Sequence, residues 1–139
     1  MTQNPDRPDD IDGVDVAPEV HRILFQNGNV RVLDVSVPPK AREAIHTHEA
    51  GALMISLTTS DLVYENWKWE DGDWVMTSSD KRTTQKGKCR WIPCEGPHVV
   101  ENLEDTVAQA LRIEFLDQPG DMEADEIIEG EPVFFDVAT

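Results

Sequence analysis

The chain has 139 residues, which is the length of one domain with a core of its own. It carries 28 acidic against 12 basic residues, and the net charge of -16 disfavours nucleic acid and anionic membrane surfaces as partners, since both attract cationic groups. No apolar run approaches the roughly 20 residues of a membrane helix and the N-terminus lacks a secretory signal, so we expect a cytoplasmic protein.

The first half of the chain begins with a polar segment and continues with predicted strands. Residues 1–18 are rich in Asp and Pro, which predicts a flexible lead-in. Two strand-like runs follow around Asn27-Gly28, a dipeptide typical of tight hairpin turns, and Pro38-Pro39 ends the second run. Residues 52–57 then read as a short buried strand.

The second half continues the same pattern. Residues 61–76 read as two runs joined by a turn at Asp71-Gly72. The runs KCRWIP (88–93) and HVVEN (98–102) are separated by CEGP, which we interpret as another turn. Residues 107–116 alternate as a strand would, although their apolar spacing also suits a helix. Many short strands separated by Gly and Pro turns predict an all-β barrel or sandwich, placed at residues 19–117.

The acidic tail, residues 118–139, contains one apolar patch made of Val133, Phe134 and Phe135. We expect this patch to pack on the barrel or on a second subunit. Together with the apolar Ile23 and Leu24 near the first strand, it predicts a homodimer, because strand edges and apolar termini need a covering surface.

Three histidines form the most informative pattern. In a strand, His46 and His48 project to one face, and His98 lies in a later strand-like run. Imidazole nitrogens brought together from adjacent strands would bind a divalent ion such as Zn, Fe, Ni, Mn or Cu. The residues alone leave open whether a metal is bound or the histidines form a metal-free polar cluster.

The segment 20–116 resembles the cupin superfamily, in particular its small single-domain bacterial members without an assigned activity. The family's second motif is matched by Gly87, Pro93, Gly96, His98 and Asn102, with the glycine after the proline one place late. Of the first motif, only the His46-Thr47-His48 core is present. The resemblance implies a double-stranded β-helix, a jelly-roll barrel whose mouth holds a metal on His46, His48 and His98.

The glutamate ligand of the first motif is absent. Ala52 or Leu53 stands at its place, Lys40 replaces the first glycine, and no glycine closes the motif near Ser60. Glu49 follows His48 directly, so a regular strand directs it to the opposite face unless a bulge intervenes. We therefore expect Glu49 to be solvated and the three histidines to leave coordination positions open.

Several other side chains are candidates with a plainer alternative. Tyr64 is a candidate catalytic acid or hydrogen-bond donor in the barrel mouth. Cys94 could approach the site, but a buried thiol without a ligand role is the simpler interpretation, and two cysteines, Cys89 and Cys94, do not indicate a disulfide framework. His21 matches no ligand position and is interpreted as structural or exposed. The tryptophans at 67, 69 and 74 fit cross-strand packing better than a ligand platform.

The leading functional hypothesis is a metal-dependent protein that binds or transforms a small, anionic molecule by oxygenase-, isomerase- or lyase-like chemistry. The alternative is a metal-free, non-catalytic sensor or small-molecule-binding protein with a degenerate site. Fold alone does not choose between them.

Overall fold

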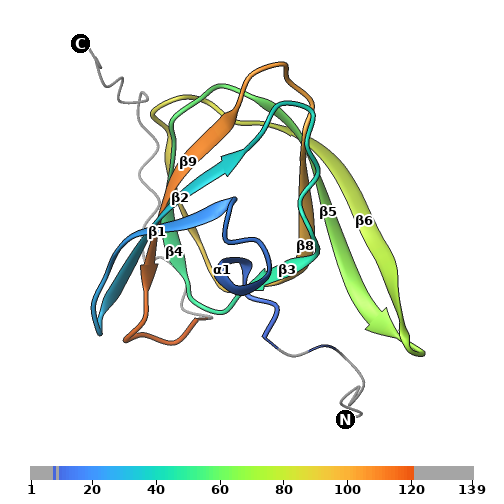
Figure 1. Ribbon diagram of the computed structural model, residues 1–139, viewed down its shortest axis with the longest axis horizontal. Coiled ribbons are helices and arrows are strands. Elements are labelled where there is room, and N and C mark those ends of the chain that lie inside the picture. Colours follow the sequence, from blue (N-terminus) through green and yellow to red (C-terminus); the bar gives the residue numbers. More distant parts are fainter. Residues whose placement is uncertain (1–7, 9, 121–139) are drawn as a thin grey trace.

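The computed structural model describes residue 8 and residues 10–120, and within them the chain forms two antiparallel sheets that face each other (Figure 1). One short helix precedes the strands, α1 (Gly13–Val16). The strands are β1 (His21–Gln26), β2 (Val30–Val37), β3 (His46–His48), β4 (Ala52–Ser56), β5 (Asp61–Glu70), β6 (Asp73–Thr83), β7 (Cys89–Ile92), β8 (Glu95–Asn102) and β9 (Ala108–Phe115).

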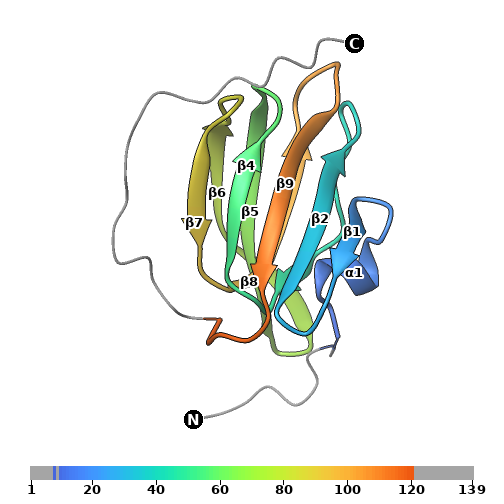
Figure 2. The same ribbon diagram turned by 90° about the vertical axis from the view of Figure 1, so that its left-hand side faces the viewer.

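The two sheets exchange strands along the sequence, as a jelly roll requires. The first sheet has the order β1-β2-β9-β4-β7, and the second has the order β3-β8-β5-β6. Figure 2 shows the first sheet face on, with β1 and β7 at its two edges. The predicted all-β architecture is confirmed, and residues 107–116 form a strand rather than a helix, β9, which pairs with both β2 and β4.

Both predicted hairpin turns are present. The side-chain oxygen of Asn27 accepts hydrogen bonds from the backbone N–H groups of Asn29 and Val30, each at 2.8 Å, and closes the β1–β2 turn. Between β5 and β6, Asp71 and Gly72 both have positive φ, 51° and 78°. Two such residues are what a tight two-residue hairpin requires, and an Asp-Gly pair adopts this conformation at low cost.

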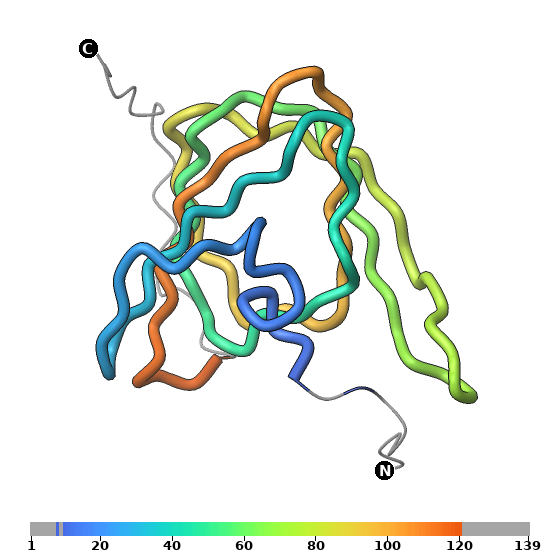
Figure 3. The backbone as a smooth tube through the Cα atoms, in the orientation of Figure 1, coloured from blue at the N-terminus to red at the C-terminus, as the bar shows by residue number. Residues whose placement is uncertain are grey.

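Two sequence interpretations need correction. The CEGP segment is not a four-residue turn, because β8 already begins at Glu95 and includes Gly96 and Pro97. The segment assigned to a flexible lead-in contains α1, whose N-cap Asp12 accepts a hydrogen bond from the Val14 N–H at 3.2 Å. Backbone pairing between Asp12 and Thr47 and the packing of α1 on β1 and β3 hold residues 12–16 across one edge of the sandwich (Figure 3).

The interior is unusually polar for its size. A small apolar cluster lies near this edge, made of Ala17, Val20, Val37 and Ala108. The largest fully buried side chains in the described part of the chain are mostly histidine, arginine and glutamate instead. Buried polar groups cost free energy unless they are paired, so a polar interior indicates a functional site rather than a packing solution.

None of the helical structure in the described range has the length and apolar character that crossing a bilayer requires. The apolar patch at Val133, Phe134 and Phe135 lies outside the described residues.

Candidate functional site

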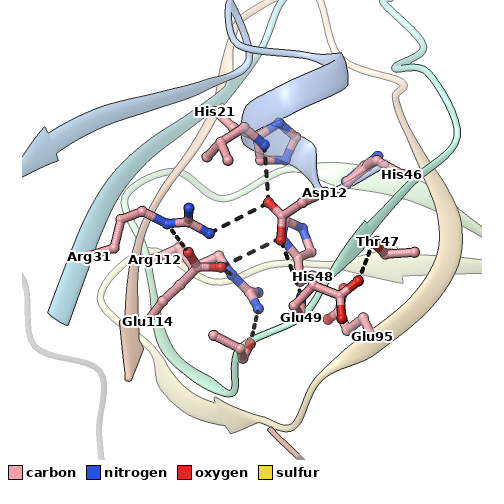
Figure 4. Close-up of polar contacts among 12 residues, drawn as sticks. Asp12, His21, Arg31, His46, Thr47, His48, Glu49, Glu95, Arg112 and Glu114 are labelled. Atoms are coloured by element: carbon pink, nitrogen blue, oxygen red, sulfur yellow. Dashed lines mark hydrogen bonds and ion pairs between the residues drawn. The ribbon is translucent and has the colours of Figure 1, made fainter. Parts of the chain in front are cut away.

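All four histidines of the chain meet inside the barrel, at the end closed by α1, and Figure 4 shows three of them, His21, His46 and His48. The ring centroids of His46 and His98 are 4.3 Å apart, those of His46 and His48 are 5.0 Å apart, and those of His48 and His98 are 5.2 Å apart. His21 belongs to the same cluster, 4.7 Å from the His46 ring. Of the two interpretations of His21, structural or exposed, the exposed one was wrong, because this first residue of β1 is 2% exposed and its ring contacts the cluster. No motif around His21 reveals this contact in the sequence.

The pairing of β3 with β8 brings two ligand-type residues of β8 to the same side. His46 lies opposite His98, and His48 lies opposite Glu95, with a shift in register between the two pairs. Three residues of β3 (46–48) thus lie opposite four residues of β8 (95–98), as in a β-bulge, which commonly re-aims a side chain next to a site. Glu95 and His98 are three apart and would point to opposite faces of a regular strand, yet both line the cavity.

Backbone carbonyls orient three of the rings. Each of these rings contacts a carbonyl oxygen through Nδ1: His21 that of Ala17 at 3.1 Å, His46 that of Ala44 at 2.8 Å, and His98 that of Gly96 at 2.8 Å. For His21 and His46, a proton on Nδ1 leaves the lone pair of Nε2 free, which is the arrangement in which histidines bind metals. Nε2 of His98 instead lies 3.0 Å from Glu95 Oε2 and donates a hydrogen bond to it.

Burial keeps three of the histidines neutral. It lowers the pKa of His21 to about 4 and that of His46 to about 3, and it holds the pKa of His48 well below its usual value. A neutral imidazole is the form that donates its lone pair to a metal ion. The three rings are therefore ready for coordination at neutral pH without losing a proton.

Glu43 lies between two of these rings. Its Oε2 is 3.8 Å from Nε2 of both His21 and His46, while its Oε1 accepts the Val100 N–H at 3.0 Å. Burial raises the pKa of the Glu43 carboxyl to about 7. A carboxyl with this pKa changes its protonation state near neutral pH, which makes it a candidate acid or base.

Glu95 forms the second carboxylate of the site. Its Oε2 is 3.0 Å from His98 Nε2 and accepts a hydrogen bond from the Tyr64 hydroxyl at 2.9 Å. Burial alone would raise the pKa of Glu95, but the contact with His98 outweighs it and lowers the value to about 2. Burial would likewise lower the pKa of His98, and Glu95 raises it instead. Burial and the Glu95 charge raise the pKa of Tyr64, so the phenol keeps its proton.

A buried network of ion pairs around Glu114 on β9 lies beside the histidine cluster. Arg112 Nε lies 3.0 Å from Glu114 Oε2 and Arg31 Nε lies 2.6 Å from Oε1, while His48 Nδ1 is 3.8 Å from Oε2 (Figure 4). Arg112 also donates to the Ala50 carbonyl at 3.1 Å. The two guanidinium groups compensate the buried carboxylate, as a charge removed from water requires.

Three buried polar atoms of the site have no hydrogen-bond partner among the described residues, namely His46 Nε2, His48 Nδ1 and Glu43 Oε2. The described donors form two groups, one of His21, His46 and His48 and one of His48, Glu95 and His98, each with ligand atoms within 4.8 Å of one another. Unpartnered buried donors of this chemistry fit a divalent ion, since nitrogen and carboxylate oxygen are the ligands that Zn, Fe and Mn accept.

A cavity of about 290 Å³ opens from this cluster through the barrel. The four histidines, Glu43, Glu95, Tyr64 and Arg112 line its inner end. Tyr64 thus lies in the cavity wall, where it stacks on His98 with a centroid separation of 5.1 Å.

The other sequence candidates lie away from this cavity. Glu49 is exposed, and Ala52 and Leu53 do not line the cavity; the carboxylates that line it are Glu43 and Glu95 instead. Cys94 is exposed, not buried as expected, because its segment lies at the surface beside Gly120, and Cys89 is also a free thiol. Trp69 and Trp74 pair across the β5–β6 hairpin with centroids 5.2 Å apart, which is packing as predicted.

Comparison with solved structures identifies the fold. The chain superposes on a cupin domain from Bordetella pertussis Tohama I with a TM-score of 0.58 and 23% identity, covering 69% of this chain and 91% of that one. An RmlC-like cupin family protein with a double-stranded β-helix fold from Methanocaldococcus jannaschii matches with a TM-score of 0.50 and 10% identity, over 73% and 81% of the two chains. No protein-family model and no curated protein matches the sequence. The chain is a small cupin-fold protein, and its double-stranded β-helix is confirmed.

Proposed function

We propose that the chain binds one divalent metal ion on His46, His48 and His98 and uses this site to bind or transform a small molecule in the barrel cavity. The observation that carries the proposal is the set of buried donor atoms without a partner, His46 Nε2, His48 Nδ1 and Glu43 Oε2. Leaving such atoms unpaired costs free energy, and a bound ion removes that cost.

The donor set supports a metal of borderline character. His48 belongs to both donor groups, so it is the ligand on which any position of the ion depends. Glu95 supplies an oxygen donor beside His98, in place of the glutamate that the first motif lacks. A mixed nitrogen and carboxylate set suits Zn, Fe or Mn better than Mg or Ca, which prefer oxygen ligands.

The surrounding side chains define what the site does to a ligand. When bound, a divalent ion supplies Lewis-acid chemistry at its open positions. Tyr64 stays protonated and presents its hydroxyl to the cavity, where it can donate a hydrogen bond to a ligand oxygen in exchange for Glu95. Glu43, with its pKa of about 7, can take up or release a proton beside the ligand.

One observation favours a second candidate, a metal-free small-molecule-binding protein. His98, Glu95 and Tyr64 already form a continuous chain of hydrogen bonds, so His98 and Glu95 are paired without an ion. A binding protein would use this chain as a fixed polar wall.

Calorimetric titration of the chelator-treated full chain with Zn²⁺ and Mn²⁺ separates the two candidates. We expect one ion to bind per chain and binding to be lost in His48→Ala. Glu49→Gln is the matched control, because it changes an exposed carboxylate one residue away, and it should leave binding unchanged. Absence of saturable binding by the wild-type chain, or equal binding by His48→Ala, would reject the metal site and leave the metal-free candidate.

A further inference from the structure

The described basic residues fall into two groups, those that form an ion pair with a described carboxylate and those that do not. Seven of them form an ion pair with a described carboxylate: Arg22, Arg31, Lys40, Arg42, Lys68, Lys81 and Arg112. The four that form none within the described residues are Arg82, Lys86, Lys88 and Arg90. These four occupy one stretch of nine residues, from the end of β6 to the start of β7.

Three of these four cations line the cavity, and we call them the cationic rim: Arg82, Lys88 and Arg90. All three are exposed to solvent, so they lie where the cavity opens rather than at its histidine end. The chain has 28 acidic residues and is strongly negative overall. The opening of the cavity is locally positive instead, because its three cations have no described carboxylate partner.

Strand pairing directs two of the rim residues inward. Arg82 pairs with Leu62 across β5 and β6, and Arg90 pairs with Met54 across β4 and β7, and both of these partners line the cavity. Directly opposed residues of a sheet point to the same face, so the two arginines enter from the two facing sheets. The guanidinium of Arg82 lies 4.1 Å from the centre of the Tyr64 ring, which connects the rim to the inner site.

The wall between the rim and the histidines is largely apolar. Its apolar residues are Val35, Val37, Met54, Leu62, Ile92 and Val100, and neutral polar residues such as Ser56, Thr58 and Gln109 also line the cavity. Charged and titratable side chains thus form two sets, the exposed cations at the opening and the buried histidines, carboxylates and Arg112 at the closed end. A ligand that fits this distribution has an acidic group, an apolar body and a second polar end.

We infer that the cavity binds a small organic acid whose carboxylate is held by Arg82, Lys88 and Arg90 while its apolar body extends toward the histidines. The inference deepens the proposed function, since it names the ligand class of the same cavity, but it does not depend on a bound metal. Guanidinium groups recognise a carboxylate through paired N–H donors. The net charge of -16 repels anions at long range. At 0.1 M salt this repulsion is screened beyond about 10 Å, so the nearby cations of the rim dominate the interaction with a bound carboxylate.

The test compares hexanoate with hexanamide, which has the same apolar body without the charge, by calorimetry or ligand-observed NMR on the full chain. We expect saturable binding of hexanoate, weaker at high salt, and at least roughly fivefold weaker binding of hexanamide. Hexyl phosphate serves as a second anionic probe. Hexyl phosphate binding more tightly than hexanoate would overturn the assignment of the rim to a carboxylate.

Lys86 provides the matched control, because it carries the same charge in the same segment without lining the cavity. Arg90→Gln and Arg82→Gln should each weaken hexanoate binding roughly fivefold, whereas Lys86→Gln should leave it unchanged. Arg82→Lys keeps the charge but loses the paired N–H donors, so it should weaken hexanoate binding less than Arg82→Gln does. Equal effects of Arg90→Gln and Lys86→Gln, or no saturable binding of hexanoate, would overturn the inference.

The titrations are run on chelator-treated protein and repeated with one equivalent of Zn²⁺. Tighter binding of hexanoate than of hexanamide both without and with Zn²⁺ supports carboxylate binding by the cationic rim, whether or not the metal site exists. Zn²⁺ binding without any preference for hexanoate over hexanamide would contradict the rim while the proposed metal site stands.

Discussion

His48 on β3 lies opposite Glu95 on β8, although its neighbour on the same face, His46, lies opposite His98. The extra residue of β8 between these pairs turns a carboxylate into the site from a position where strand alternation would direct it outward. The bulge therefore supplies the negative charge that the first motif lacks, beside two of the proposed ligands.

Replacing Glu95 tests this relationship. Glu95→Gln keeps the shape and can still accept a hydrogen bond from Tyr64, but it removes the charge beside His98. We expect the affinity for Zn²⁺ to fall at least about tenfold, as changes to metal ligands or their hydrogen-bond partners do. Competition titration with a chromogenic chelator measures it, with Glu49→Gln as control. Unchanged affinity in Glu95→Gln would mean that Glu95 takes no part in metal binding.

Gly13 controls the position of His21. A Cβ built at Gly13 would lie 2.9 Å from three ring atoms of His21, closer than packed atoms allow, whereas one at Gly28 would meet nothing within 4 Å. Gly13→Ala should therefore displace the His21 ring and lower the free energy of unfolding by about 1–3 kcal/mol, despite the better helix propensity of alanine.

Urea denaturation of the two variants checks this expectation, with Gly28→Ala as the control. A shift of the histidine ring NMR signals should accompany the loss in Gly13→Ala. If Gly13→Ala is as stable as the wild-type chain, the packing of α1 against His21 is looser than the structure indicates.

The sequence determined the architecture well and the site only in part. Strand alternation, the Asn27-Gly28 and Asp71-Gly72 turns and the spacing around His98 predicted the barrel and its second motif. These signals are local, because they depend on the residue itself and its neighbours in the chain.

Residues that enter the site from distant positions left no such signal. Glu95 was assigned to a turn because Gly96 and Pro97 follow it, and a bulge cannot be located from one sequence. Glu43 lies outside any predicted strand, and Glu114, within the run 107–116, belongs to no motif. His21 reaches the cluster only because the segment from Asp12 to Ala17 crosses the edge of the sandwich.

The stability of the metal-free chain should depend on pH. The pKa values of His21 and His46 are lowered to about 4 and about 3 from 6.5, and that of His48 is also lowered, so below pH 6.5 the unfolded chain binds more protons at these three rings than the folded chain does. The pKa of Glu43 is raised from 4.5 to about 7, so this carboxyl binds up to one more proton in the folded chain than in the unfolded chain. Its contribution to the pH dependence is therefore opposite to that of the three rings and smaller. Stability should thus fall as the pH falls from 6.5 to 4.5.

Urea denaturation of chelator-treated protein at several pH values measures this slope. Each net proton corresponds to roughly 1.4 kcal/mol per pH unit, so His21→Gln, which removes one such ring, should flatten the slope by about that amount. A wild-type stability that is constant or rises toward pH 4.5 would contradict the neutral state of the buried histidines.

We propose that the chain is a homodimer through β1, the edge strand of the five-stranded sheet. Ile23, Leu24 and Phe25 are 46%, 50% and 54% exposed on this edge, and an apolar edge strand invites pairing with another chain. Light scattering should give twice the monomer mass of 15.7 kDa. Leu24→Lys should shift the mass toward the monomer, while Met76→Lys on the edge strand of the other sheet should not. A wild-type mass of one chain at micromolar concentration would exclude this dimer.

X-ray absorption at the zinc edge of the full chain with one equivalent of Zn²⁺ shows directly whether the histidine cluster binds the ion. We expect imidazole ligands with nitrogen at about 2.0–2.1 Å and oxygen in the remaining positions. Sulfur at about 2.3 Å would place the ion on the exposed thiols of Cys89 and Cys94, and a shell of oxygen alone would indicate nonspecific binding to acidic side chains. Either of these results would mean that the histidine cluster is not the site that binds Zn²⁺.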